Sequence, residues 1–162
     1  MYRLVLYSLL VMVGVAIFFG LVGFISFTAT QLISSALILF ITCYGSNYLL
    51  AKIFNAATNI ESSSITSLIL FFILTPAIAT NDIFTLIIAG ILAMASKYLL
   101  AIHKQHIFNP AAIAAVILVL FGNPQVSWWI ATFPLFPITL IAGLLSVRKI
   151  RRFQLFFSFL LT

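Results

Sequence analysis

Hydroxyl and amide side chains stand at two places where a helix is expected to begin. The run Ser62-Ser63-Ser64-Ile65-Thr66-Ser67 leads into a short apolar segment that Thr75-Pro76 interrupts, and Asn109-Pro110 leads into another that ends at Gly122. Serine and asparagine cap helix amino ends, and proline fits the first helical position. Such ends carry partial positive charge, so two of them facing one pocket suit a phosphate, a carboxylate or a reduced flavin ring. The alternative is two ordinary capped starts of tilted helices.

The titratable residues are few. Glu61 and Asp82 are the only carboxylates. Acids within membranes mark ion pathways, and Glu61, beside the serine run, is the candidate for one. Asp82 is expected to cap the helix that follows it.

A second group of titratable side chains lies in the segment His103-Lys104-Gln105-His106. A His-x-x-His pair can bind a metal when helical, but cysteine and carboxylate partners are lacking nearby, so we predict no metal site. We expect an interfacial loop that meets lipid phosphates. Alternatively, Lys104 and His106 contact an anionic cofactor at the neighbouring Asn109.

The composition excludes a soluble protein. Of 162 residues, 64% are hydrophobic and only 6% are charged, with a mean hydropathy of +1.29. Soluble domains carry about 25% charged residues. The net charge of +6 does not indicate nucleic-acid binding, because long uncharged stretches separate the basic residues. Cys43 is the single cysteine, which excludes a disulfide framework, and no catalytic constellation is present, so no catalytic residue is assigned.

The gaps between charges predict an all-α integral membrane protein with six transmembrane helices, since a spanning helix needs about 20 residues. The spans are expected near residues 4–25, 32–51, 65–79, 83–102, 110–121 and 131–147. Two of them, near 62–79 and 109–121, are short or broken. Residues 1–152 form the predicted polytopic membrane domain. The apolar residues 153–162 either begin an incomplete seventh span or lie along the membrane interface.

The distribution of basic residues supports six crossings. With this number, all eight lysines and arginines fall on one side, and the opposite side receives only Asp82. Lysine and arginine gather in cytoplasmic loops, so the N-terminus and the cluster Arg148–Arg152 are predicted to be cytoplasmic.

One motif resembles a known family. The stretch from Ser96 to Leu100, followed by Lys104-Gln105-His106-Ile107-Phe108-Asn109-Pro110-Ala111-Ala112, resembles the NqrB/RnfD family of membrane proteins, which belong to the sodium-pumping NADH:quinone oxidoreductase (Nqr) and to the Rnf complex. That family carries an IFNPA signature at the start of a membrane helix. The helix ending at Pro76 is similar to its TGLLLALLLP segment. Trp128-Trp129 with the stretch from Gly143 to Phe153 looks like a branch whose membrane part leads into a ferredoxin-reductase-like flavin and NADH module.

The resemblance implies a membrane subunit of a redox-driven complex in the plasma membrane of a bacterium or archaeon. Electrons pass through flavins and are coupled to Na⁺ or H⁺ transport, and the fold is one of two inverted repeats. Family members attach FMN to the threonine of an SGAT motif. Here the counterpart is Ile130-Ala131-Thr132, with Trp129 and Ile130 at the serine and glycine positions, so non-covalent FMN or riboflavin is expected near Asn109 and the serine run.

Two alternatives remain beside this interpretation. The chain is a passive carrier or channel for a small solute or ion, or it is a structural membrane subunit without a ligand. In the redox interpretation, an NADH- or ferredoxin-oxidising flavoprotein module or subunit supplies the electrons, and the chain alone catalyses nothing. An open half of an inverted repeat also predicts a homodimer or hetero-oligomer.

Overall fold

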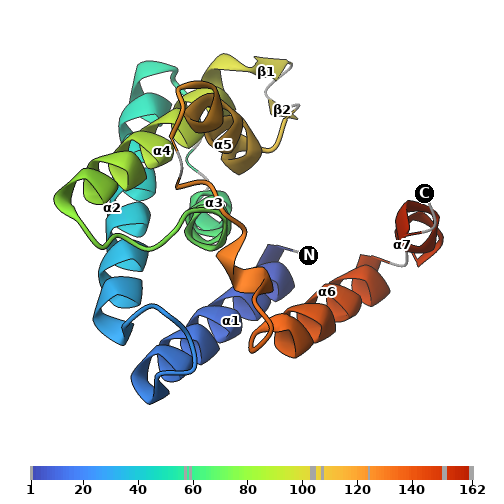
Figure 1. Cartoon of the computed structure of the whole chain (residues 1–162). Coiled ribbons are helices and arrows are strands. Elements are labelled where there is room, and N and C mark those ends of the chain that lie inside the picture. Colours follow the sequence, from blue (N-terminus) through green and yellow to red (C-terminus); the bar gives the residue numbers. More distant parts are fainter. Residues whose placement is uncertain are drawn as a thin grey trace.

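The computed structural model describes residues 2–56, 58, 60–102, 105–106, 108–123, 125–150 and 153–160. Seven helices form in this part of the chain (Figure 1): α1 (Tyr2–Val22), α2 (Ala29–Ile53), α3 (Ile60–Ile73), α4 (Thr80–Leu99), α5 (Pro110–Leu120), α6 (Phe136–Ile150) and α7 (Phe153–Leu160). Two antiparallel two-residue strands, β1 (Ala101–Ile102) and β2 (Gln105–His106), and the 3₁₀ turn η1 (Trp129–Ala131) complete the described elements. The predicted helical class is confirmed.

Three helices, α1, α2 and α4, are long and apolar enough to cross a membrane, which identifies a membrane protein. The others are shorter. α3 has 14 residues and α5 has 11. They rise about 21 Å and about 16 Å, against a hydrocarbon core of about 30 Å. The structure thus supports three full spans, and the six spans with an incomplete seventh stay a prediction.

The boundaries of α3 correct the expected span near 65–79. The helix begins at Ile60, five residues earlier, and it ends at Ile73. Proline disfavours helical geometry at the residue before it, which accounts for an end ahead of Thr75-Pro76. Leu74 and the residues up to Ala79 are non-helical, and Leu74, Pro76 and Ala77 are buried. The interruption at Thr75-Pro76 is therefore confirmed, and the continuation of the span through Ala79 is wrong.

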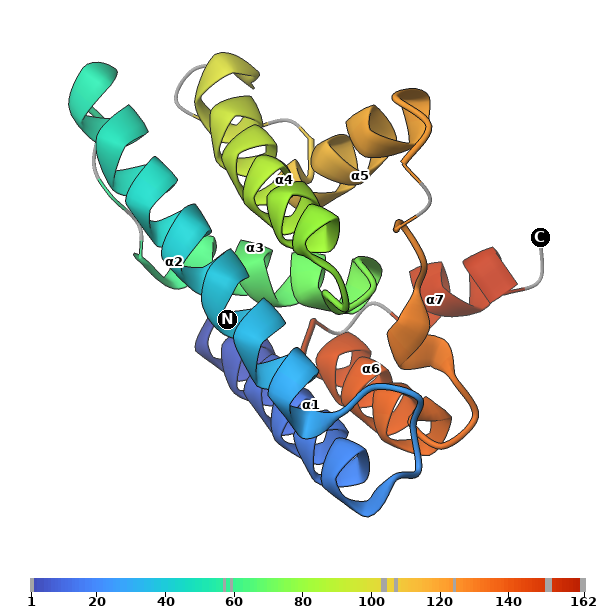
Figure 2. The ribbon, with the colours of Figure 1, turned by 60° about the vertical axis from the view of Figure 1, so that its left-hand side comes forward.

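The long helices pack closely through small residues. α2 runs along α4 and also contacts α1 and α3, and Figure 2 shows α3 crossing these longer helices. On α4, a Cβ at Gly90 would lie 2.9 Å from Thr42 Cγ2, and a Cβ at Gly20 on α1 would lie 3.0 Å from Leu32 Cδ1. These two glycines therefore permit close approach, as expected in membrane helices. Gly143 on α6, by contrast, has nothing within 4 Å of a Cβ placed there.

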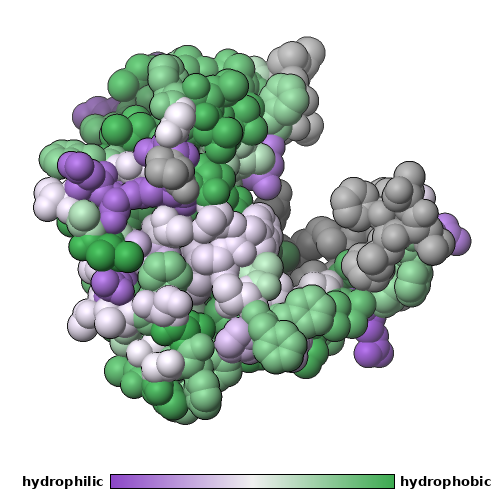
Figure 3. Space-filling model, viewed as in Figure 1, coloured by the Kyte–Doolittle hydropathy of each residue, from purple (hydrophilic) through white to green (hydrophobic). Residues whose placement is uncertain are grey.

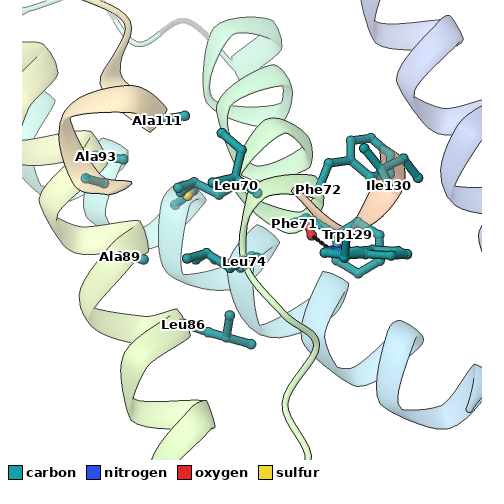
Figure 4. Close-up of a cluster of buried hydrophobic side chains, with 14 of the residues drawn as sticks. Leu70, Phe71, Phe72, Leu74, Leu86, Ala89, Ala93, Ala111, Trp129 and Ile130 are labelled. Carbon is teal, nitrogen blue, oxygen red and sulfur yellow. Dashed lines mark hydrogen bonds between the residues drawn. The ribbon is translucent and has the colours of Figure 1, made fainter. Parts of the chain in front are cut away.

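An aromatic cluster forms the core around η1 (Figure 4). Trp129 is only 5% exposed, and its indole Nε1 donates to the Phe71 carbonyl at 2.7 Å. Its ring meets Phe71 edge-on, with centroids 5.2 Å apart. The polar atom of Trp129 is therefore satisfied inside the protein, while Trp128 is exposed.

The outer surface is largely apolar. Figure 3 shows hydrophobic residues over much of the visible face. Large apolar side chains are exposed along all three long helices, including Val11 on α1, Ile41 on α2 and Phe84 on α4. Because water would penalise such a surface, its solvent is the lipid hydrocarbon.

Candidate functional site

The amino end of α5 has the predicted cap. Asn109 Oδ1 accepts a hydrogen bond from the Ala111 amide at 3.0 Å, and Pro110 occupies the first helical turn. Asn109 and Phe108 are exposed, whereas Pro110 and Ala111 are buried. The cap is thus confirmed, at a point where the chain passes from exposed to buried residues.

The hydroxyl run has a different role from the one predicted. Ser63 and Ser64 both donate to the Ile60 carbonyl at 2.9 Å, and Thr66 donates to the Ser62 carbonyl at 2.9 Å. These side chains stand inside α3 and bond to its preceding turn, as hydroxyls within helices do. Ser62 also lies within the first turn of α3. The expectation that the run caps the helix is therefore wrong for Ser63, Ser64 and Thr66.

Ala111, at the start of α5, lies in the same buried cluster as Leu70 of α3 and Ala93 of α4 (Figure 4). Ser63 precedes Leu70 by about two turns of α3, or roughly 10 Å. The start of α5 thus shares the buried core with the last turn of α3, and the convergence of the two helix starts on one pocket stays a prediction.

Glu61 joins two helix starts. Its Oε1 lies 3.3 Å from Arg3 Nε, and the two side chains are 44% and 79% exposed. The pair places the beginnings of α1 and α3 at one end of the molecule, as the charge distribution predicts. Exposed ion pairs contribute at most about 1 kcal/mol to stability, so this pair adds little to the stability of the fold. The ion pathway at Glu61 stays a prediction.

The remaining expected positions are only partly described. Lys104, like His103, lies outside the described residues, as do Arg151 and Arg152. The backbone of His106 belongs to β2, opposite Ala101. Thr132 follows η1 directly and is exposed, and its amide donates to the Trp129 carbonyl at 3.3 Å.

The structure builds a second site, which we call the crossing, where the chain leaves α3 and α5. Residues 73–75 and 125–127 pair as short antiparallel segments. The Thr75 amide donates to the Gln125 carbonyl at 2.9 Å, and the Ser127 amide donates to the Ile73 carbonyl at 2.9 Å. The chain that leaves α5 thus returns to pair with the carboxyl end of α3.

Polar side chains surround the crossing. Asp82 Oδ2 accepts from the amides of Ile78 and Ala79 at 2.9 and 2.8 Å, which confirms its predicted capping role. Asp82 Oδ1 accepts from the Gln125 side-chain amide. Asn123 Nδ2 donates to Thr85 Oγ1 at 3.1 Å.

Two further polar groups lie in this region, one of them with a hydrogen-bond partner and one without. The buried Ser35 hydroxyl of α2 accepts from the Ala77 amide at 2.8 Å. Gln125 Oε1 is buried and has no hydrogen-bond partner among the described residues. A buried acceptor without a donor is costly, so it marks a place where water or a cation is favoured.

Sequence reasoning missed Gln125, Asn123 and Ser35. The only signal near them was the Gly122-Asn123-Pro124 turn, which indicated a chain reversal but no partner. Their importance depends on the pairing of segments about 50 positions apart, as in the contact from Thr75 to Gln125. A single sequence does not reveal such pairing.

Comparisons with protein-family models, with curated proteins and with solved structures found no match for this chain. The family resemblance therefore stays a prediction.

Proposed function

We propose that this chain is a membrane subunit of a redox-driven, ion-translocating electron-transport complex, which binds flavin and couples electron transfer to Na⁺ or H⁺ transport. The crossing is the observation that carries the transport part. Non-helical backbone at membrane depth is tolerated only where protein buries it or where it lines a cavity, and Leu74, Pro76 and Ala77 are buried. Transport proteins use interrupted helices of this kind to build their sites.

The flavin part rests on the family resemblance and on the exposed, capped start of α5. The partial positive charge at the start of α5 would attract the anionic ring or phosphate, and Lys104 and His106 precede this helix in the chain. An N-terminal helix end attracts such groups. The flavin would accept and release electrons, and these residues would hold and orient it. We propose FMN or riboflavin, bound non-covalently, with an NADH- or ferredoxin-oxidising partner as the electron source.

The cellular arrangement follows from the charges. We propose the plasma membrane of a bacterium or archaeon, with the N-terminus and the Arg148–Arg152 cluster in the cytoplasm. The Arg3–Glu61 pair supports this by bringing two of the cytoplasmic segments together.

The first test is the flavin content of the protein purified in detergent. We expect flavin absorbance, and release of the flavin on denaturation. Asn109→Asp keeps a side-chain acceptor for the cap, and it adds negative charge where the anionic ring would bind. We therefore expect it to lose flavin while the helix content stays unchanged. Asp is an equally good cap, so a folding defect is not expected. Protein without flavin before and after denaturation would overturn the flavin assignment.

A passive ion channel or solute carrier is the second candidate. The polar groups at the crossing favour it independently of flavin, because Asp82 and Gln125 Oε1, which has no partner in the part of the chain that the structure describes, offer oxygens to a passing cation. Proteoliposomes separate the two functions. Flux of Na⁺ or H⁺ without any redox donor supports the passive function, and flux only with a reduced partner supports the redox function.

A further inference from the structure

The carboxyl end of α2 forms an open cleft of about 570 Å³. Its lining residues are Tyr48, Ala51, Lys52, Asn55, Ala56 and Thr58. Lys52 is the only charged residue among the described residues of the lining, while hydroxyl and amide groups of Tyr48, Asn55 and Thr58 provide hydrogen-bond donors. The lining therefore suits a phosphate group.

The chain folds back sharply beneath this cleft. Asn55 has a φ of 47°, a left-handed conformation that asparagine tolerates better than most residues. The fold-back lets the Ala56 amide donate to the Ala51 carbonyl at 2.9 Å, while the Phe54 amide donates to the Leu50 carbonyl at 2.9 Å. Two carbonyls at the end of α2 are thus already paired. The helix end contributes only about half a negative charge, so the full charge of Lys52 outweighs it.

The adjoining end of α4 packs against the end of α2 beside the cleft. The ends of α2 and α4 lie at the same end of the molecule in Figures 1 and 2. The Tyr98 hydroxyl donates to Asn47 Oδ1 at 2.9 Å, and its ring stacks on Phe54 with centroids 5.8 Å apart. Lys97 Nζ lies 3.4 Å from the same Asn47 Oδ1, a neutral acceptor.

Both carboxylate side chains of the chain are bound at other places and do not pair with Lys52. These are Glu61 and Asp82. Glu61 binds Arg3, and Asp82 binds backbone amides and Gln125 at the crossing. An anion that binds Lys52 in the cleft must therefore come from outside the chain.

The exposed face of α2 shows which anion this is. A stripe of exposed apolar and aromatic side chains leads along α2 to Lys52: Ile33, Leu37, Ile41, Tyr44 and Tyr48. Their spacing of three or four places them on one helix face. The stripe rises about 22 Å, enough for an acyl chain within one leaflet of a hydrocarbon core about 30 Å thick. A free phosphate would make no use of it.

We propose that this cleft binds the headgroup of an anionic phospholipid, with Lys52 against the phosphate and the acyl chain along the α2 stripe. Basic pockets at the cytoplasmic ends of membrane helices bind such headgroups. The site is separate from the start of α5 and from the crossing, and it does not depend on the proposed redox function.

Native mass spectrometry of the detergent-purified chain tests this proposal, with phosphatidylglycerol and phosphatidylcholine supplied in equal amounts. We expect preferential retention of phosphatidylglycerol. Lys52→Gln should lower the preference about five-fold, the effect of one cation near an anionic headgroup. Lys52→Arg should restore it. Arg148→Gln removes an exposed charge at the end of α6 and should leave the preference unchanged.

Three results would overturn the proposal. Lys52→Gln could bind the two lipids as the unmodified chain does, or Arg148→Gln could reduce the preference equally, which indicates a general charge effect. Retention of inorganic phosphate that displaces phosphatidylglycerol would identify a free-anion site instead. Because Lys52 is exposed, circular dichroism should show the same helix content for each variant.

Discussion

Two regions of the bundle achieve their packing in different ways. α2 and α4 are long helices in close contact, where Gly90 meets Thr42 and small residues such as Ala89 and Ala93 are buried. The crossing joins two short helices through extended segments, and the aromatic cluster of Trp129 packs beside it. In the first region stability depends on the absence of side-chain volume. In the second it depends on a large side chain and on backbone pairing, so the two regions should respond oppositely to changes in size.

The largest effect is expected for Trp129→Ala. The substitution removes a buried ring from contact with Phe71, Phe72 and Phe27, and it leaves the Phe71 carbonyl without its donor. Truncations of this kind cost about 3–5 kcal/mol. The free energy of unfolding, measured by circular dichroism during denaturation from detergent micelles, checks the value.

Trp128→Ala is the matched control, because its ring is 59% exposed. We expect a change within about 0.5 kcal/mol, as for other surface substitutions. Equal losses from the two tryptophans would contradict the placement of η1 in the core.

Gly90→Ala should destabilise the packing of α2 against α4, because it adds a side chain where the two helices are in close contact. The new Cβ would lie 2.9 Å from Thr42 Cγ2 and 3.2 Å from Thr42 Cβ, which is fixed to the α2 backbone. The two helices must separate, at a cost of about 1–3 kcal/mol. This exceeds the gain of up to about 1 kcal/mol from replacing a helical glycine. Unfolding of the variant in detergent measures the net loss.

Gly143→Ala provides the comparison within α6, where a Cβ meets nothing within 4 Å. Only the helix-propensity gain remains, so this variant should be slightly more stable than the unmodified chain. If both alanine variants gain stability, the contact between α2 and α4 is looser than the structure indicates.

Helix starts and breaks that depend on residues within one turn could be predicted from the sequence. Asn109-Pro110 marked the start of α5, Pro76 marked the break after α3, and Asp82 marked the start of α4, because caps and prolines work through the nearest turn. The long uncharged gaps similarly located α1, α2 and α4. The prediction that the serine run caps the helix was wrong because hydroxyls inside a helix also donate to carbonyls of the preceding turn.

Features that depend on distant pairing could not be predicted. The position of Trp129 in the core requires the Phe71 carbonyl as its acceptor, and Gln125 requires Thr75 and Asp82 beside it. Each partner lies 43 or more positions away in the chain. Tryptophan at the end of a predicted span fits a membrane interface equally well. The sequence therefore located the helices of this chain but not the crossing that joins two of them.

The smallest effect is expected at the polar end of the α2 and α4 pair. Tyr98→Phe removes the hydroxyl that donates to Asn47 Oδ1 at 2.9 Å but retains the ring stacked on Phe54. Because Lys97 still reaches the same oxygen, Asn47 keeps one donor, and the loss should be about 1 kcal/mol. Tyr44→Phe, at an exposed position on α2, controls for loss of a tyrosine hydroxyl and should change stability by less. A loss from Tyr98→Phe well above about 1.5 kcal/mol, the upper range for one neutral hydrogen bond, would mean that hydrogen bonding contributes more than close packing to holding the long helices together.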